Sequence, residues 1–438
     1  MRRSGLLLSI ALLGCQRRPV APAAPPAPGL SIDLAPGSVD AGAAAPVTAT
    51  ETPSEARCGW QWPAESALEI AAAPEAVTAF DVACTGRALV AFWHRGATLT
   101  AASRSLSADS AWGDAVEISR EASAMGTSLG AAQGAWVAYE SPGPTLRVAS
   151  LRNDVLRRSD PVQLGRVAAI QPMVLWAQDN LAVVAVTLAE RGHERVLIAR
   201  VSTDGQIPAA GAVLGDGVAV AVHPGARAWV AVATAERLER GAAGPWSLTG
   251  WRIDPRLAGA FGASIRAGQF GALPPDAATR LGSLTLGHGR FEVSPYASAS
   301  GAVLYQTVLG AERGMARLAW VGEGAPSRVD LRTAPSALAG VFERDPDTVE
   351  ARYWDEQNTL VSRLISRTEA APPRPLDAPL ADAPAVLARA QGTRTVLCGG
   401  TRWRLSLSTT RANEPARLEA AREDCLDARA ARADGGRD

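Results

Sequence analysis

Lysine is absent from this sequence of 438 residues: all 44 residues of the combined Lys and Arg count are arginines, and 44 acidic residues balance them. Chemistry that depends on a lysine amine, such as Schiff-base formation, is therefore excluded. The formal net charge of zero leaves no basic excess for a nucleic-acid-binding surface, so we expect no nucleic-acid partner. The use of arginine alone is what a GC-rich coding sequence produces.

Motifs for metals, phosphates and nucleophiles are equally scarce. There is no Cys-x-x-Cys, no Walker loop and no Gly-x-Gly-x-x-Gly. No histidine lies at metal-ligand spacing from another; the four are His94, His193, His223 and His288. The segment Gly126-Thr127-Ser128-Leu129-Gly130 matches Gly-x-Ser-x-Gly, but a strand follows it instead of the helix that a nucleophile elbow requires. We therefore expect no catalytic residue, no metal and no cofactor.

What the sequence does contain is a short apolar strand that returns seven times. The copies begin at Ala88, Ala135, Leu181, Ala228, Ala302, Thr348 and Thr395, so the steps between them are 47, 46, 47, 74, 46 and 47 residues. A period in the forties built from short strands is typical of a β-propeller, in which each unit forms one four-stranded blade. The sequence therefore predicts an all-β fold, a seven-bladed β-propeller of antiparallel blades.

Each copy is expected to be the second strand of its blade. In the first unit an apolar segment at 80–84 and a Gly-containing turn precede it, and strands at 98–103 and 115–119 follow it. These second strands are apolar on both faces, as strands sandwiched between neighbouring blades should be. Large side chains beside them are interpreted as core packing and not as a ligand platform: Trp93, Trp136, Trp229 and Trp354.

The two ends of the chain are predicted to share the last blade. Residues 60–70 resemble the fourth strand of the first unit but have no first three strands before them, and residues 385–408 supply three strands without a fourth. Their combination closes the ring and removes its exposed strand edges. After it, residues 413–422 read as a helix capped by Asn413, with Pro415 in the first turn. The expected boundaries are 58–412 for the propeller and 413–438 for a C-terminal helix and tail.

Four cysteines lie in the propeller region: Cys58, Cys84, Cys398 and Cys425. An even number in an exported chain predicts two disulfides, and three connectivities are open from the sequence alone. We favour a bond between Cys58 and Cys425 that staples the chain ends in the closing blade. This choice leaves Cys84 and Cys398 to join adjacent blades.

The N-terminus has the pattern of an export signal. Arg2 and Arg3 precede a short apolar run that is too short to span a bilayer, and the run ends in Leu12-Leu13-Gly14-Cys15. This end resembles the lipobox of bacterial lipoproteins. The resemblance implies that residues 1–14 are a signal peptide, that Cys15 carries the lipid, and that the lipid anchors the protein to the cell envelope. Gln16 after the cysteine implies the outer membrane.

Two further segments depart from the blade pattern. Residues 15–57 begin with the lipidated cysteine and continue as a Pro- and Ala-rich stretch, which predicts a disordered, semi-stiff tether. The long step of 74 residues places an insertion at about 255–281, after the third strand of the fourth unit. Long loops on rigid scaffolds often carry function, so this insertion is a candidate binding element.

The loops between the second and third strands should emerge on one face of the ring, and several of them combine Arg with Glu or His. Arginines that converge around a channel suit carboxylate or sugar partners. The candidate binding face consists of Arg95, Arg191, His193, Arg237, Arg240, Arg313 and Glu356.

Over residues 58–412 the repeats, together with the lipobox, resemble bacterial lipoproteins that carry a seven-bladed propeller. Segments 107–112 and 202–205 also resemble degraded Asp-box turns of sialidase propellers, a distant likeness. The resemblance implies a lipid-anchored cell-envelope module that binds a protein or carbohydrate ligand or acts as a scaffold. Two alternatives stay open: a degenerate or divergent sialidase-like carbohydrate-active enzyme, and a structural subunit of an envelope complex.

Overall fold

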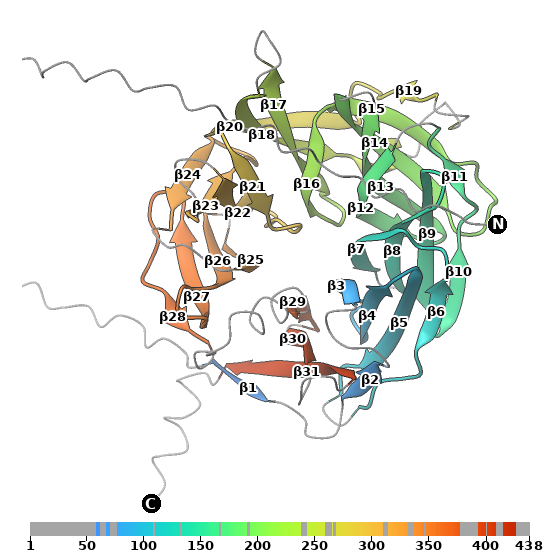
Figure 1. The fold of residues 1–438 in the computed structure, drawn as a ribbon, viewed down its shortest axis with the longest axis horizontal. Helices are drawn as coiled ribbons and strands as arrows, with labels where there is room; N and C mark the ends of the chain where they lie inside the picture. The colour runs from blue at the N-terminus through green and yellow to red at the C-terminus, as the bar shows by residue number, and fades with distance from the viewer. Residues whose placement is uncertain are drawn as a thin grey trace, which may run out of the picture. The chain divides into compact units, whose positions relative to one another are not determined.

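The computed structural model describes residues 58–61, 67–70 and 77–425, with gaps at 108–109, 132–133, 166–167, 191–192, 238–242, 259–264, 266–268, 310–313, 332–336, 346, 377–392, 400 and 409–414. The secondary structure of this part is almost entirely β-strand, with one four-residue helix, α1 (Pro255–Ala258). Seven sheets surround a central axis, as Figure 1 shows. The chain therefore folds as a seven-bladed β-propeller, and the predicted fold class is confirmed.

In the first six blades the strands follow chain order from the axis outward. Blade 1 contains β3 (Val77–Cys84), β4 (Ala88–Arg95), β5 (Thr98–Ser105) and β6 (Val116–Ser119). Blade 2 contains β7 (Ala124–Ala131), β8 (Gly134–Ser141), β9 (Thr145–Arg152) and β10 (Val155–Arg158), and β11 (Val162–Gln163) also pairs with β9. Blade 3 contains β12 (Ala168–Gln178), β13 (Leu181–Glu190), β14 (His193–Ser202) and β15 (Ala210–Asp216).

The next three blades repeat this arrangement. Blade 4 contains β16 (Val218–His223), β17 (Trp229–Arg237), β18 (Ala243–Ile253) and β20 (Ala278–Gly287). Blade 5 contains β21 (Arg290–Val293), β22 (Ala302–Leu309), β23 (Ala316–Trp320) and β24 (Ser327–Asp330). Blade 6 contains β25 (Ala337–Asp345), β26 (Thr348–Trp354), β27 (Leu360–Ser366) and β28 (Arg374–Pro375). In all six blades the repeated apolar segment is the second strand, as predicted.

Blade 7 is built from both ends of the propeller sequence. Its order is β29 (Thr393–Cys398), β30 (Thr401–Ser408) and β31 (Ala416–Cys425), and β31 pairs on its outer side with β1 (Cys58–Gln61) and β2 (Leu68–Ile70). The prediction that the N-terminal strand completes the last blade is confirmed. β29 is the innermost of the described strands of this blade, so the seventh copy of the repeat is the first of these strands and not the second.

The predicted C-terminal helix is wrong, because residues 416–425 form strand β31. Ala416, Leu418 and Ala420 are buried while Arg417 is exposed, an alternation of period two that a strand requires. Leu418 pairs with Leu407 of β30, and the open edge of β30 needs such a partner. This pairing outweighs the helix propensity of Ala, Arg, Leu and Glu. The propeller therefore continues to Cys425, past the expected boundary at 412.

Apolar clusters fill the spaces between blades. They occupy six of the seven interfaces in the described part of the chain, namely 1/2, 2/3, 3/4, 4/5, 5/6 and 7/1. The four tryptophans expected in the core are at most 5% exposed. Burial of this apolar surface is the main force that holds the blades together.

Hydrogen bonds also link the innermost strands of neighbouring blades, and each bond joins residues that are one repeat period apart in the sequence. The backbone N–H of Ser128 donates to Asp81 Oδ2 at 2.6 Å, and that of Val174 donates to Thr127 Oγ1 at 2.9 Å; both pairs are 47 residues apart. β7 approaches its neighbours so closely that a Cβ on Gly126 would lie 1.6 Å from the Pro172 carbonyl oxygen. The Gly-x-Ser-x-Gly match thus lies within a strand, where its glycines permit close packing.

The insertion lies between β18 and β20 and crosses to the neighbouring blade. Its β19 (Gly271–Ala272) adds a fifth, parallel strand to the outer edge of blade 3 by pairing with β15. The backbone N–H of Ile265 donates to the Ala209 carbonyl at 2.9 Å, and the Ile265 side chain packs beside Leu197. The described part of the insertion therefore covers a strand edge, which is a stabilising role.

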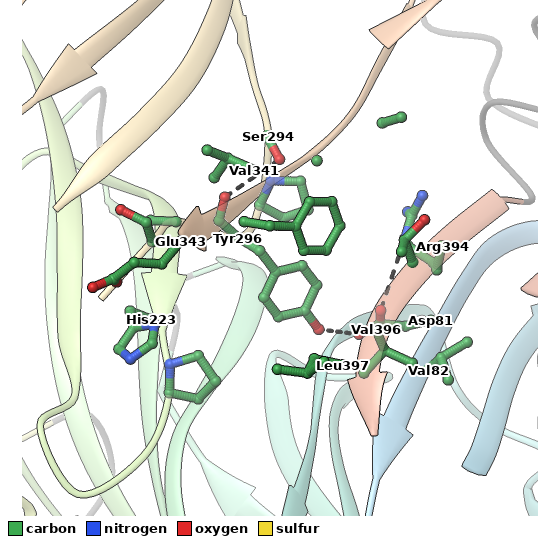
Figure 2. A pocket seen from close by; sticks show the side chains of 18 of the residues that line it. Asp81, Val82, His223, Ser294, Tyr296, Val341, Glu343, Arg394, Val396 and Leu397 are labelled. Carbon is green, nitrogen blue, oxygen red and sulfur yellow. Dashed lines mark hydrogen bonds and ion pairs between the residues drawn. The ribbon is translucent and has the colours of Figure 1, made fainter. Parts of the chain in front are cut away.

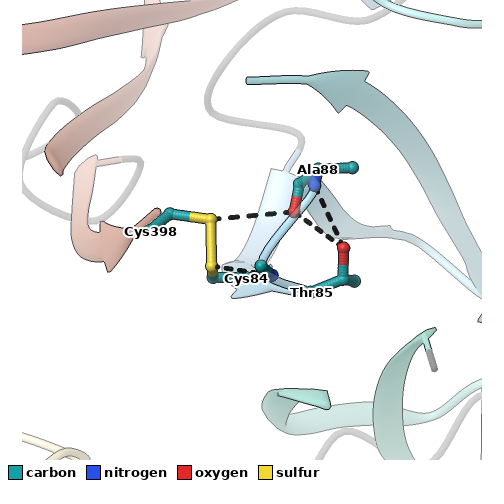
Figure 3. The surroundings of a disulfide bond; sticks show 5 residues. Cys84, Thr85, Ala88 and Cys398 are labelled. Carbon is teal, nitrogen blue, oxygen red and sulfur yellow. Dashed lines mark hydrogen bonds between the residues drawn. A yellow bond between two sulfur atoms is a disulfide. The ribbon is translucent and has the colours of Figure 1, made fainter. Parts of the chain in front are cut away.

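A disulfide joins Cys84 at the end of β3 to Cys398 at the end of β29 (Figure 3). It joins adjacent blades, as expected from the sequence, and it does so through the first described strands of blades 1 and 7. For the other pair, the register places Cys58 of β1 directly opposite Cys425 of β31. The side chains of these two cysteines lie outside the described residues, so their bond stays a prediction.

The predicted signal peptide, the lipidated Cys15 and the tether also lie outside the described residues. In the described part of the chain no helix is long and apolar enough to cross a membrane.

Candidate functional site

A cavity of about 1410 Å³ lies at the centre of the ring. Its walls come from the first strands of blades 1, 2, 4, 6 and 7, from the start of β30, and from β21 with the segment 294–299 that follows it in blade 5. Strand β25 contributes residues along nearly its whole length, so the cavity extends furthest beside blade 6. Side chains from distant parts of the sequence therefore converge on one volume.

The cavity lies toward the face of the ring that carries the turns between first and second strands. In blades 1, 2 and 4 its lining residues are 81–84, 128–130 and His223, at the carboxyl ends of β3, β7 and β16. The loops between second and third strands lie at the other end of the antiparallel blades. The cavity is therefore on the side opposite to the binding face predicted from the sequence.

Tyr296 crosses the channel and links blades that are not neighbours (Figure 2). Its own segment is held to blade 4, where the Val222 N–H donates to the Pro295 carbonyl at 2.9 Å. Its phenol donates a hydrogen bond to Asp81 Oδ2 in blade 1. The Ser128 backbone N–H in blade 2 lies 3.2 Å from the phenol oxygen. The Tyr296 side chain thus connects blade 5 to blades 1 and 2 through the centre of the ring, and the backbone beside it connects to blade 4.

The protonation states of Asp81 and Tyr296 follow from their burial. Burial raises the pKa of Asp81, and the charge of Arg394 with hydrogen bonds from Tyr296 and Ser128 opposes that rise. Burial and the carboxyl of Asp81 raise the pKa of Tyr296 well above its ordinary value. The phenol of Tyr296 is therefore neutral at neutral pH and acts as a hydrogen-bond donor to Asp81.

Two buried polar atoms beside this bond have no hydrogen-bond partner among the described residues. One is Ser128 Oγ, on a side chain that is 3% exposed. The other is Nε of Arg394, which lies 3.8 Å from Asp81 Oδ1 and so pairs with it only loosely. Buried polar atoms are nearly always satisfied in native proteins, by protein, water or a bound ligand. The Ser128 hydroxyl is enclosed, whereas the Arg394 side chain is 25% exposed and lines the cavity, so part of its guanidinium is open to an occupant.

A second polar group forms the wall between blades 6 and 7. Glu350 of β26 is buried and binds three guanidiniums: Arg344, Arg352 at 2.8 Å and Arg402 at 2.9 Å. Ser362 Oγ donates to the same carboxylate at 2.8 Å. Burial would raise the pKa of Glu350, but the charges of the three arginines outweigh it and lower the pKa to about 2.

This group replaces apolar packing at one blade interface. Among the described residues, the 6/7 interface is the one without an apolar cluster that spans it, because the nearest cluster, around Trp354, lies within blade 6. Ion pairs span this interface instead: Glu350 and Arg352 lie at alternate positions of β26, and Glu350 also pairs with Arg402 of β30. The Cζ atoms of these two arginines lie 5.2 and 5.9 Å from the ring centroid of Phe342. The cavity thus borders a charged interface.

His223 of blade 4 and Glu343 of blade 6 also line the cavity (Figure 2). Burial lowers the pKa of His223, although a hydrogen bond from the imidazole to the Ala297 backbone and the charge of Glu343 oppose the shift. Glu343 is exposed and accepts a hydrogen bond from the Ser300 N–H at 2.9 Å. His223 is therefore a neutral donor or acceptor at neutral pH.

Other isolated histidines have structural roles or lie at the surface. His94 is buried, its Nε2 donates to the Ala122 carbonyl at 3.0 Å, and its Nδ1 accepts from Thr78 at 2.7 Å. Among the described residues, no group of three or more His, Cys, Asp and Glu is placed to hold a metal ion.

The predicted binding face is described only in part. Arg95, His193 and Glu356 are exposed at connections between second and third strands, where the sequence placed them, and Arg237 ends β17. Arg95, His193 and Glu356 do not line the channel cavity. Arg191, Arg240 and Arg313 lie outside the described residues. This face remains a prediction.

Sequence reasoning did not identify the residues of the channel, although some of them left a signal. Asp81 is an acid inside an otherwise apolar first strand, Phe80-Asp81-Val82-Ala83-Cys84. Glu350 and Arg352 interrupt a second strand whose counterparts in other blades are apolar. Charged residues at positions that should be buried indicate a specific site. For Tyr296, no pattern in the sequence predicts that its segment turns into the channel.

No protein-family model and no curated protein matches this chain. Among solved structures, the WD40 domain of coronin from Toxoplasma gondii is similar over 85% of this chain and 87% of that one, with 10% identity and a TM-score of 0.49. The N-terminal domain of Nup159 is similar over 85% and 97%, with 10% identity and a TM-score of 0.44. The polysaccharide lyase Uly1 is similar over 79% and 90%, with 10% identity and a TM-score of 0.41. These similarities are too distant to transfer a ligand or an activity to this chain.

Proposed function

We propose that this protein is a lipid-anchored binding module of the cell envelope and that its propeller binds a ligand in the central cavity. The observation that carries the binding role is the convergence on one volume of a carboxyl, a phenol, a hydroxyl, an imidazole and guanidiniums from six blades. A concave site with a few convergent polar groups is the usual form of a ligand site. Export and the anchor at Cys15 rest on the sequence, in which the lipobox follows two arginines and an apolar run.

A cavity-blocking variant tests the binding role. Leu397 lines the cavity, and it is 61% exposed, so Leu397→Trp adds bulk where there is room for it. Leu364, which is 41% exposed on β27, does not line the cavity and provides the matched control Leu364→Trp. The full-length proteins are purified from their native cells, and molecules released on denaturation are identified by mass spectrometry. We expect to recover a specific small molecule from the wild type and from the control Leu364→Trp, but not from Leu397→Trp. Recovery of the same amount from all three proteins, or of none from any of them, contradicts the proposal.

Fractionation tests the anchor separately. Cys15→Ser removes the only sulfur that the lipobox can lipidate, so the protein should move from the membrane fraction to the soluble fraction. Cys398→Ser, which removes a cysteine of the propeller, should leave the protein in the membrane fraction. Retention of Cys15→Ser in the membrane would contradict lipid anchoring and leave the cavity result unaffected.

A further inference from the structure

The wall of the cavity between β25 and β29 combines a cationic group with an exposed apolar one. Arg344, at the end of β25, lines the cavity with 43% of its side chain exposed. Leu397, at the end of β29, lines the same cavity and is the most exposed large apolar side chain among the described residues. A cavity that presents both a large exposed apolar side chain and a guanidinium is typical of a site for an amphiphilic ligand.

The partner of Arg344 neutralises it only in part. The ion pair of Arg344 is with Glu350, and the same carboxylate is shared with Arg352 and Arg402. A guanidinium has five N–H donors in a planar fork, so the half-exposed Arg344 can present a second edge to a carboxylate in the cavity. Arg394, a further arginine that lines the cavity, has its Nε buried without a hydrogen-bond partner among the described residues.

The acidic residues of the cavity are engaged elsewhere and do not compete for the same place. Asp81 accepts hydrogen bonds from Tyr296 and Ser128. Glu343 accepts one from the Ser300 N–H. Glu292 accepts one from Gln306 Nε2. Arg344, on the wall between β25 and β29, is thus the part of the cavity that suits an anionic group.

From this geometry we infer that the cavity binds a small organic anion with an apolar body. Its carboxylate pairs with Arg344, its apolar part covers Leu397, and Arg394 adds a second favourable charge at the inner end. This inference rests on the proposed binding role of the cavity and narrows it to one class of ligand.

Calorimetry with a matched pair of probes tests the inference on the full-length chain carrying Cys15→Ser, which avoids detergent. 2-Naphthoate and its uncharged isostere 2-naphthamide share an apolar body and differ in charge. We expect naphthoate to bind at least about tenfold more tightly than the amide, because an ion pair adds to the same apolar contact. Equal affinity for both probes, or no heat from either at about 1 mM, overturns the inference.

Variants locate the site. Arg344→Gln should weaken naphthoate binding at least about tenfold and leave amide binding unchanged, whereas the surface variant Arg120→Gln should change neither. Glu350→Gln should strengthen naphthoate binding, because it removes the carboxylate that competes for Arg344. A role of Glu350 limited to stability would give no such gain. If Glu350→Gln does not fold, the variants Arg344→Gln and Leu397→Ala test the inference. It is wrong if both variants bind naphthoate as tightly as the wild type does.

The two proposals fail in different ways. If naphthoate does not bind but a molecule is recovered from the wild type and not from Leu397→Trp, the binding role stands and the ligand is not an organic anion. If no molecule is recovered and neither probe binds, both proposals are wrong.

Discussion

The phenol of Tyr296 donates a hydrogen bond to the carboxyl of Asp81, which lies 215 positions earlier in the sequence and on the far side of the channel. Tyr296→Phe removes this donor and should lower the free energy of unfolding by about 2 kcal/mol. The phenol stabilises the ionised carboxylate, so the loss should be largest above the raised pKa of Asp81 and should shrink as pH falls through it. Urea unfolding at several pH values measures both effects.

A matched control is available for this prediction. The hydroxyl of Tyr353 is buried and has no hydrogen-bond partner among the described residues, so Tyr353→Phe should be neutral or slightly stabilising. If the two variants lose the same free energy, Tyr296 contributes only packing and the bridge across the channel has no energetic role.

Glu350 should stabilise the protein in a pH-dependent way. Its pKa is lowered from 4.5 to about 2, so its contribution is complete above 4.5 and is lost as pH falls toward 2. Glu350→Gln should therefore cost on the order of 3 kcal/mol at neutral pH and very little near pH 2. Glu117→Gln, at an exposed ion pair with Arg120, should cost less than about 1 kcal/mol. Thermal unfolding at both pH values measures the difference, and a pH-independent loss would contradict the assignment.

The disulfides give a third prediction. Non-reducing peptide mapping should find Cys84 joined to Cys398 and, from the strand register, Cys58 joined to Cys425. The first bond closes a long loop, so replacing both of its cysteines by serine should lower the free energy of unfolding by about 4 kcal/mol. Peptides that join Cys58 to Cys84 would show that the register of β1 and β31 is not the one described.

Truncation tests the corrected boundary of the propeller. A chain that ends at residue 412 lacks β31, so β1 and β2 lose their partner and β30 keeps an open edge. We expect this chain to aggregate, while one that ends at residue 430 stays monodisperse with the same circular dichroism spectrum as the full chain. Size-exclusion chromatography distinguishes them, and a soluble, folded 412-residue chain would show that β31 is dispensable.

Most of the fold was predictable because it depends on periodic burial. A strand sandwiched between two blades must be apolar, and the repeat of such strands specifies the number of blades without any knowledge of contacts. The last blade departed from the prediction at β31, whose Ala, Arg, Leu and Glu residues favour a helix in isolation. Only the open edge of β30, which is a tertiary feature, makes them a strand.

The candidate site was less predictable for a related reason. Loop charges are visible in a sequence and indicate a binding face at the second-to-third-strand loops. The cavity, in contrast, is lined by single residues of inner strands that lie far apart in the chain. Asp81 and Arg394 are separated by the whole ring in sequence but lie 3.8 Å apart at their nearest charged atoms. Their meeting depends on closure of the ring through blade 7, which neither residue signals by itself.

The composition of blade 7 also determines when the ring can close during folding. β31 and β1 are the last and first strands of the propeller, so their pairing has the largest sequence separation of any in the described fold. Contacts of such separation form late, because the loop-closure entropy must be overcome before they contribute stability. Until β31 is available, blades 1 to 6 can form only an open arc with two uncovered faces. This arc is the state most exposed to misassembly, and conditions that speed ring closure should raise the yield of folded protein.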